Sequence, residues 1–586
     1  MSTTPTTNAA RSSAQKKADS KAETPSNWPT SDLAEPLNIR RIGHILLAAG
    51  LFLFGFAISL WYGRQGMNPL DSSIVFDGGW RLLQGQRFFV DFSSPSGFAP
   101  SFIQAIFFQI FGVNWFAYCL HAAVFNGLFA LLVYGVLLLA KGPRWLSAGY
   151  AALSAVVFYP PMGVPYLEQH AFFFILLAVY VATLAAKMNG GWRFGLLSTL
   201  PTIALFAILS KQSPGFFVFP LILIVLICWF PIREWKNLIL PLLGGLMPAF
   251  ILLILMVGDA GLGSPGFWQG FWTLPQTIAD QRLEEWTYGP FKTIRTIAWY
   301  PFQVLGGFDF IHRYLLYVPF LLLAVEVLIR FMQQRLRNDW PPIRLLILGI
   351  GLTVTCSFFM HFTLNQPQNG LPLVFVAIGL GHIFWREWLR GFAGDVRFRP
   401  VWLPPLLNGL SILLFVSGMW STWQFHKQTN EPRFALDFTD QFPFNSELPV
   451  DRQWGFLNYQ APYIWGDLKP WEFVEWMNAR EGNFLLFGDL SIVYGLTGRP
   501  SVSPALWFHE GLTFPAQGTE GFAEFDAKLL AACKSDRLKY LVFEQESRET
   551  WMHSKFEDFP QTSAYLHDRE FGGLTVGGFL VVKLDP

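Results

Sequence analysis

Apolar segments long enough, or nearly long enough, to cross a bilayer recur through most of this 586-residue chain. We expect them at residues 42–62, 115–140, 145–160, 169–187, 194–210, 215–231, 237–257, 313–330, 345–361, 370–385 and 401–421. Only 14% of the residues are charged, against about 25% in an ordinary soluble domain. The pattern predicts a polytopic α-helical membrane protein with about 11 transmembrane helices. It excludes a simple water-soluble enzyme and a disordered scaffold.

Net charge and cysteine content further limit the class of protein that this chain can be. The formal net charge is +1, so the chain lacks the strongly basic surface that collects nucleic acid. Cys119, Cys228 and Cys356 lie in apolar segments, and only Cys533 lies in the polar C-terminal part. That part therefore cannot form an internal disulfide. Because no Cys-x-x-Cys motif or Cys/His cluster occurs, a structural zinc site is not expected.

Charge also predicts how the chain is oriented. Residues 1–38 are rich in Ser, Thr, Ala, Pro and Lys, a composition that predicts a disordered tail. Lys and Arg gather in alternate short loops of the membrane part, residues 39–421, which fits a cytoplasmic N-terminus. An odd number of spans then places residues 422–586 in the periplasm or outside the cell. The short loops indicate a bacterial inner or plasma membrane.

The C-terminal part, residues 422–586, has the composition of a small soluble α/β domain. We expect helices at 472–480 and 523–534, strands at 483–490 and 539–545, and a terminal strand or hairpin at 574–584. No Gly-rich phosphate loop or nucleophile elbow occurs in it. Two long loops, 63–114 and 258–312, are expected on the same side of the membrane, and long ordered loops are often functional. The apolar run at 99–112 is predicted to be an interfacial helix.

The first long loop contains three carboxylates, each of which has a structural interpretation. Asp71 precedes two serines and an apolar run, as a helix N-cap does. Asp77 lies four residues before Arg81, which suggests an ion pair on a helix surface. Asp91 opens a stretch rich in Ser, Pro and Gly, where a role in a turn is natural. Taken singly, each acid is expected to be structural.

Five motifs follow one another through this loop. They are Asp71, Leu83-Gln84-Gly85, Phe89-Val90-Asp91-Phe92, Pro95-Ser96-Gly97 and Phe111-Gly112. Their order and spacing resemble the first extracytoplasmic loop of the C-type (GT-C) membrane glycosyltransferases, including bacterial enzymes of the aminoarabinose transferase and protein mannosyltransferase kind. The acid of that family maps onto Asp71, fourteen residues before Gly85, and not onto Asp77. Ser72 stands where the family often has a Glu.

Two further motifs extend the resemblance over most of residues 42–586. The first is Pro-Tyr-Leu-Glu-Gln-His, which contains Glu168 and His170 and matches a polar cluster where the third and fourth spans meet the far side. The second is Leu-Ser-Lys-Gln-Ser-Pro-Gly, which contains Lys211 and Gln212 and matches a lysine at the end of the fifth span. Small α/β domains after the last span also recur in that superfamily.

The resemblance implies transfer of a sugar from a polyprenyl phosphate to an acceptor hydroxyl, with inversion at the anomeric carbon. Asp71 is the expected general base, because a nearby carboxylate can take the hydroxyl proton. Asp91 and Glu168 are the secondary candidates. Lys211 is expected to stabilise charge on the leaving phosphate, with Arg295 and then Arg313 as weaker candidates. Equally, Lys211 could be a snorkelling lysine at the end of a span.

His170, Gln212 and His361 are candidates for positioning the sugar or acceptor. The alternatives are an interfacial Glu168–His170 pair without chemistry, and a merely solvated loop after His361. The sequence points to no particular cofactor; a divalent metal could share the phosphate charge, as in some relatives, but the sequence contains no set of ligands that compels it.

The expected partners are a polyprenyl-phosphate-linked sugar, membrane lipids and an acceptor that is a lipid, a glycan or a protein. The C-terminal domain would bind the acceptor or cap the site. One alternative is a transporter or flippase of lipid-linked sugars, but such proteins often have internal repeats and charges near the membrane midplane. This chain has no visible repeat, and its acids cluster at one face. A catalytically degenerate binding subunit is a second alternative, which the Ser72 departure keeps open.

Overall fold

A computed structural model describes residues 39–63, 69–94, 97–159, 163–276, 341–363 and 370–394 of the membrane part, with 409, 416, 419 and 420 besides. In the C-terminal part it describes 459–461, 466–468 and most of 470–584. The chain divides into two compact units, Met1–Leu47 and Ala48–Pro586, and the contacts below lie within the second. The predicted tail at 1–38 lies outside the described residues.

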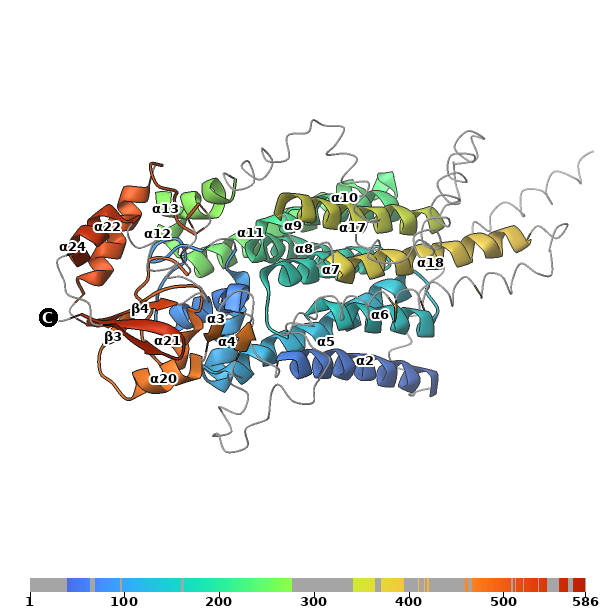
Figure 1. The fold of residues 1–586 in the computed structure, drawn as a ribbon. Helices are drawn as coiled ribbons and strands as arrows, with labels where there is room; N and C mark the ends of the chain where they lie inside the picture. The colour runs from blue at the N-terminus through green and yellow to red at the C-terminus, as the bar shows by residue number, and fades with distance from the viewer. Residues whose placement is uncertain are drawn as a thin grey trace, which may run out of the picture. The chain divides into compact units, whose positions relative to one another are not determined.

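The membrane part is mainly helical in its described ranges (Figure 1), and the turns and isolated bridges of residues 84–94 are the main exception. Its long helices are α2 (Ile39–Gly63), α5 (Trp115–Leu139), α6 (Arg144–Phe158), α7 (Leu167–Ala185), α8 (Gly190–Ser210), α10 (Val218–Trp229), α11 (Lys236–Val257), α17 (Pro341–Thr363) and α18 (Leu371–Gly394). Two short turns, α9 (Gln212–Gly215) and η2 (Ile232–Glu234), connect them. The polytopic helical fold predicted from the sequence is confirmed.

Six helices among the described residues are long and apolar enough to cross a membrane: α2, α5, α7, α8, α9 joined to α10, and α11. The helices α6, α17 and α18 match three more predicted segments, but α6 has only 15 residues, and α17 and α18 contain shorter apolar stretches. The predicted segment at 313–330 and nearly all of that at 401–421 lie outside the described residues. The predicted total of about 11 spans is therefore not confirmed.

The helices differ in how far they are enclosed by protein. In α7, 78% of the most apolar window is buried, against 22% in α11. Large side chains of α11, such as Leu240 and Leu255, face outward, as lipid-contacting side chains do. α7 packs on α8, α5 and α10, so it forms the centre of this helical layer.

Both predicted long loops contain further helices. The loop after α2 forms α3 (Pro69–Leu83) and α4 (Ala99–Phe111), which pack on each other. α4 confirms the helix expected at 99–112; its place at a membrane interface stays a prediction. The loop after α11 begins with α12 (Asp259–Leu262), α13 (Pro265–Trp268) and the π-helical turn η3 (Gln269–Thr273).

The C-terminal part is a small α/β structure, as predicted. A four-stranded sheet has the order β3-β4-β6-β5, in which β3 (Asn483–Phe487) and β4 (Leu538–Glu544) are parallel. The hairpin of β5 (Gly573–Val576) and β6 (Phe579–Lys583) completes it, with β6 antiparallel to β4. The helices are α20 (Pro470–Asn478), α21 (Ile492–Leu496), α22 (Phe522–Cys533) and α24 (Pro560–His567), and β1 (Tyr459–Ala461) pairs with β2 (Gly466–Leu468).

Strand β3 is buried on both faces, and the two faces belong to different cores. All five residues of β3 are buried, and alternate side chains of a strand point to opposite faces. Leu485 and Phe487 pack into a core with α22. Phe484 and Leu486 pack into a second core, which also contains Phe76 of α3. The C-terminal sheet therefore shares a hydrophobic core with the first long loop.

Candidate active site

Lys211 and Glu168 form an ion pair where α7 begins and α8 ends. Lys211 directly follows α8, and its Nζ donates to Oε2 of Glu168, in the first turn of α7, over 3.2 Å. The two side chains are 21% and 8% exposed. Nζ also lies 5.4 Å from the centre of the Phe359 ring of α17. The ammonium is thus held by a carboxylate and an aromatic face but keeps some access from outside.

The first long loop packs directly on the segment that leads to Lys211. A Cβ atom added at Gly97 would overlap the carbonyl group of Leu209, so only glycine permits this approach. On its other side, the Gln212 amide donates to the Phe271 carbonyl over 2.9 Å. Two loops that sequence analysis singled out therefore meet at residues 209–212.

His170 lies in a buried polar network beside the ion pair. Its Nε2 is 2.9 Å from Nε2 of His121 on α5, and its Nδ1 is 2.8 Å from the Tyr166 carbonyl oxygen. The Tyr159 hydroxyl lies 2.9 Å from the same Nδ1. His121 in turn contacts the Gln104 side chain of α4 over 2.9 Å. The network links α4, α5 and α7 with the residue after α6, so it fixes the helix end that carries Glu168.

His121, Gln104 and Phe359 were not predicted from the sequence. The first two had a usable signal, because a histidine or glutamine inside an apolar helix is costly and is usually paired or functional. Phe359 had none, since it is one of 60 phenylalanines in the chain.

The acids of the first long loop lie in contrasting surroundings. Asp77 forms the expected pair with Arg81, 2.8 Å from Nε, but the prediction of a surface pair is wrong, because both side chains are 0% exposed. Residues near 501 cover them, and the Ser501 hydroxyl donates to Asp77 over 2.6 Å. Burial raises the pKa of the Asp77 carboxyl, and the Arg81 charge and the Ser501 hydrogen bond oppose that rise. Asp91 is exposed and accepts the backbone N–H of Arg87 over 2.7 Å, a turn contact.

The remaining candidates are only partly described. Asp71 is the third residue of α3, and His361 lies near the end of α17, but their side chains are outside the described part of the structure. Arg295 and Arg313 are outside it altogether. Within the described ranges, no three His, Cys, Asp or Glu side chains gather to hold a metal ion. The described donors near Lys211 thus do not form a divalent-metal site.

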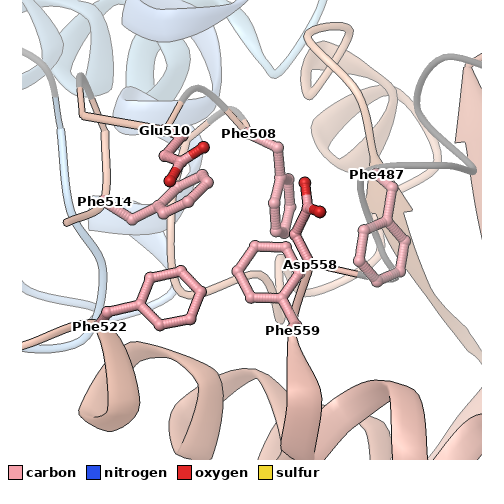
Figure 2. Close-up of a pocket in the computed structure, with 7 residues that line it drawn as sticks. All are labelled: Phe487, Phe508, Glu510, Phe514, Phe522, Asp558 and Phe559. Carbon is pink, nitrogen blue, oxygen red and sulfur yellow. The ribbon is translucent and has the colours of Figure 1, made fainter. Parts of the chain in front are cut away.

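A small cavity in the C-terminal part does not add a ligand site. Figure 2 shows the phenyl rings of Phe508, Phe514, Phe522 and Phe559 grouped there, with the carboxylates of Glu510 and Asp558 beside them. Its volume of about 10 Å³ is near the minimum for one water molecule. Ligand pockets are usually at least about 300 Å³.

Comparisons with known proteins give a likeness at the level of solved structures. No protein-family model and no curated protein matches the chain. The chain is similar to the crystal structure of ArnT from Cupriavidus metallidurans bound to undecaprenyl phosphate, with 14% identity and a TM-score of 0.48. The match covers 92% of this chain and 98% of that one. The apo structure of the same protein gives the same identity and TM-score and covers 93% of this chain and 98% of that one.

Proposed function

We propose that this protein is an integral-membrane glycosyltransferase that moves a sugar from a polyprenyl phosphate to a cell-envelope acceptor. The observation that carries the proposal is the Lys211–Glu168 pair. It joins two motifs named by the family resemblance, and the first long loop packs on the residues beside it. The site would lie on the periplasmic or outer side of the membrane, with the N-terminus in the cytoplasm.

Lys211 would bind the phosphate of the donor. An ammonium has three N–H donors and Glu168 accepts one, so Lys211 can donate to a phosphate oxygen while the pair persists. The site is largely enclosed, and a positioned charge stabilises developing negative charge more strongly there than in water. His170 would act indirectly, by holding the helix end that carries Glu168.

Asp71 would act as the general base. The acceptor oxygen forms its bond to the anomeric carbon as the bond from that carbon to the phosphate oxygen breaks. The hydroxyl proton passes to the Asp71 carboxylate, and the polyprenyl phosphate leaves with the electron pair. Attack opposite the leaving group inverts the anomeric carbon.

Sugar transfer in membranes, given a panel of polyprenyl-phosphate sugars, tests the proposal. We expect Asp71→Asn to abolish transfer at matched expression, while Ser72→Ala, one residue further along the same helix, retains it. If Asp91→Asn or Glu168→Gln abolishes transfer and Asp71→Asn does not, the residue changed in the inactive variant is the general base. A wild type that binds the donors but transfers none of them would contradict the enzyme and favour a transporter or a binding subunit.

A further inference from the structure

Arg81 is a fully buried arginine on α3 that bonds to the C-terminal part of the chain. Its Nε donates to Asp77 over 2.8 Å, and its Nη1 donates to the Ser503 carbonyl over 2.7 Å. Nη2 lies 3.5 Å from the Ala505 carbonyl oxygen, and the guanidinium stacks 4.7 Å from the centre of the Phe92 ring. Arginine is almost never fully buried unless it is paired. The burial of Arg81 therefore depends on these contacts with Asp77, Phe92 and residues 503–505.

Other side chains of α3, and Gln86 just after it, contact the same stretch. The Ser501 hydroxyl donates to Asp77, which is 424 residues away in sequence, over 2.6 Å. The Gln86 amide donates to the Ser501 carbonyl over 2.7 Å. The Trp80 indole N–H donates to the Arg499 carbonyl over 2.9 Å. Charged, polar and aromatic groups thus attach α3 and the turn after it to residues 499–505.

Backbone pairing and apolar packing extend the attachment. The Ser93 N–H donates to the Pro504 carbonyl over 2.8 Å, and the Leu506 N–H donates back to the Ser93 carbonyl over 3.1 Å. Helix α21 packs on α3, and an added Cβ at Gly495 would crowd Phe76. The first long loop is therefore held by the C-terminal part through main chain and side chains together.

We propose that these contacts form an α3 clamp, in which residues 499–506 hold the Asp77–Arg81 pair and thereby position the helix that carries Asp71. Asp77, Arg81 and Ser501 are then positioning residues and do not touch substrate. The inference rests on the proposed role of Asp71.

Distance along the helix explains why the clamp matters. Asp71 lies six residues before Asp77, about 9 Å along a helix that rises 1.5 Å per residue. A tilt of about 6° at Asp77 would therefore move the Asp71 backbone by about 1 Å. A misplacement of that size can cost up to about 100-fold in rate.

The test compares Arg81→Lys and Ser501→Ala with the matched control Arg87→Lys, which alters an exposed Arg–Asp pair of the same spacing in the same loop. With purified, folded enzyme, we expect the two clamp variants to lower kcat by about 10-fold or more, with the KM for the donor unchanged. The control should stay within about twofold of wild type. Ser501→Ala keeps the test valid if Arg81→Lys does not fold. Unchanged kcat in both clamp variants would overturn the proposal.

An engineered disulfide distinguishes positioning of α3 by the clamp from other roles of Arg81. Ser93 and Ala505 are β-bridge partners, close enough for a disulfide between cysteines at these positions. Oxidising Ser93→Cys/Ala505→Cys in the Ser501→Ala background should restore kcat, and reduction should lose it again. The clamp would be overturned if the disulfide did not restore kcat and Ser501→Ala left the hydrogen exchange of the α3 backbone amides unchanged. If wild type transfers no sugar, the proposed function fails, whereas faster α3 exchange in the clamp variants would still support the clamp.

Discussion

Two ion pairs in this molecule, one of arginine with aspartate and one of lysine with glutamate, differ in how far they are enclosed and in what else they bind. Asp77–Arg81 is 0% exposed on both sides, and Arg81 and Asp77 make further bonds to residues near 501 and 503. Lys211–Glu168 is 21% and 8% exposed, and a hydrogen bond of 3.2 Å joins its two partners. A buried pair whose groups bond to a distant part of the chain serves to join segments. A pair that keeps some access and spare donors is suited to receive a ligand.

The largest expected effect comes from breaking the inaccessible pair. Arg81→Ala leaves the Asp77 carboxylate buried without its counter-ion, which should destabilise the fold by about 3–5 kcal/mol. Thermal unfolding in detergent, followed by tryptophan fluorescence, measures the loss. Asp77→Leu combined with Arg81→Met removes both charges and should recover part of the stability. If the double variant is as unstable as the sum of the single ones, the two charges are not coupled.

Breaking the accessible pair should instead act on rate. Lys211→Gln keeps a donor for Glu168 but loses the charge that would face the phosphate, so we expect kcat to fall by about 100- to 1000-fold. The melting temperature should change little, because a hydrogen bond to Glu168 can persist. Lys211→Arg restores the charge and should recover part of the activity. A large drop in melting temperature with kcat retained in Lys211→Gln would assign this pair to structure as well.

The two pairs also show which features of the fold and the site could be predicted from the sequence and which could not. Helices and strands such as α20, β3 and α22 were predictable because their side chains repeat with local periods. Glu168 and Lys211 were singled out separately by family resemblance, yet their pairing crosses 43 residues and has no local signal. Ser501 and Ser503 were missed because a hydroxyl and a backbone carbonyl leave no pattern in the sequence: the Ser501 hydroxyl donates to Asp77, and the Ser503 carbonyl accepts from Arg81. Spacing predicted the Asp77–Arg81 pair but not its burial, which depends on chain more than 400 residues away.

The smallest expected effect tests whether burial, and not spacing, separates structural from incidental pairs. Arg87 and Asp91 are also four residues apart and follow the buried Asp77–Arg81 pair in the same loop. Their side chains are 50% and 37% exposed, and the Arg87 Nε lies 3.4 Å from the Asp91 carboxylate. Water screens such a pair, so Arg87→Ala should lower the free energy of unfolding by at most about 1 kcal/mol. The backbone N–H of Arg87 still donates to Asp91, so the turn survives the substitution.

The same thermal-unfolding measurement, run beside Arg81→Ala, gives the comparison directly. A loss for Arg87→Ala equal to that for Arg81→Ala would mean that the charge pair itself, and not its enclosure by residues 499–505, holds the loop. A small loss at Arg87 beside a large one at Arg81 would favour enclosure by the distant chain segment as the cause. Both pairs join an Arg to an Asp four residues away in the same loop, although Asp77–Arg81 lies in α3 and Arg87–Asp91 lies in the turn after it.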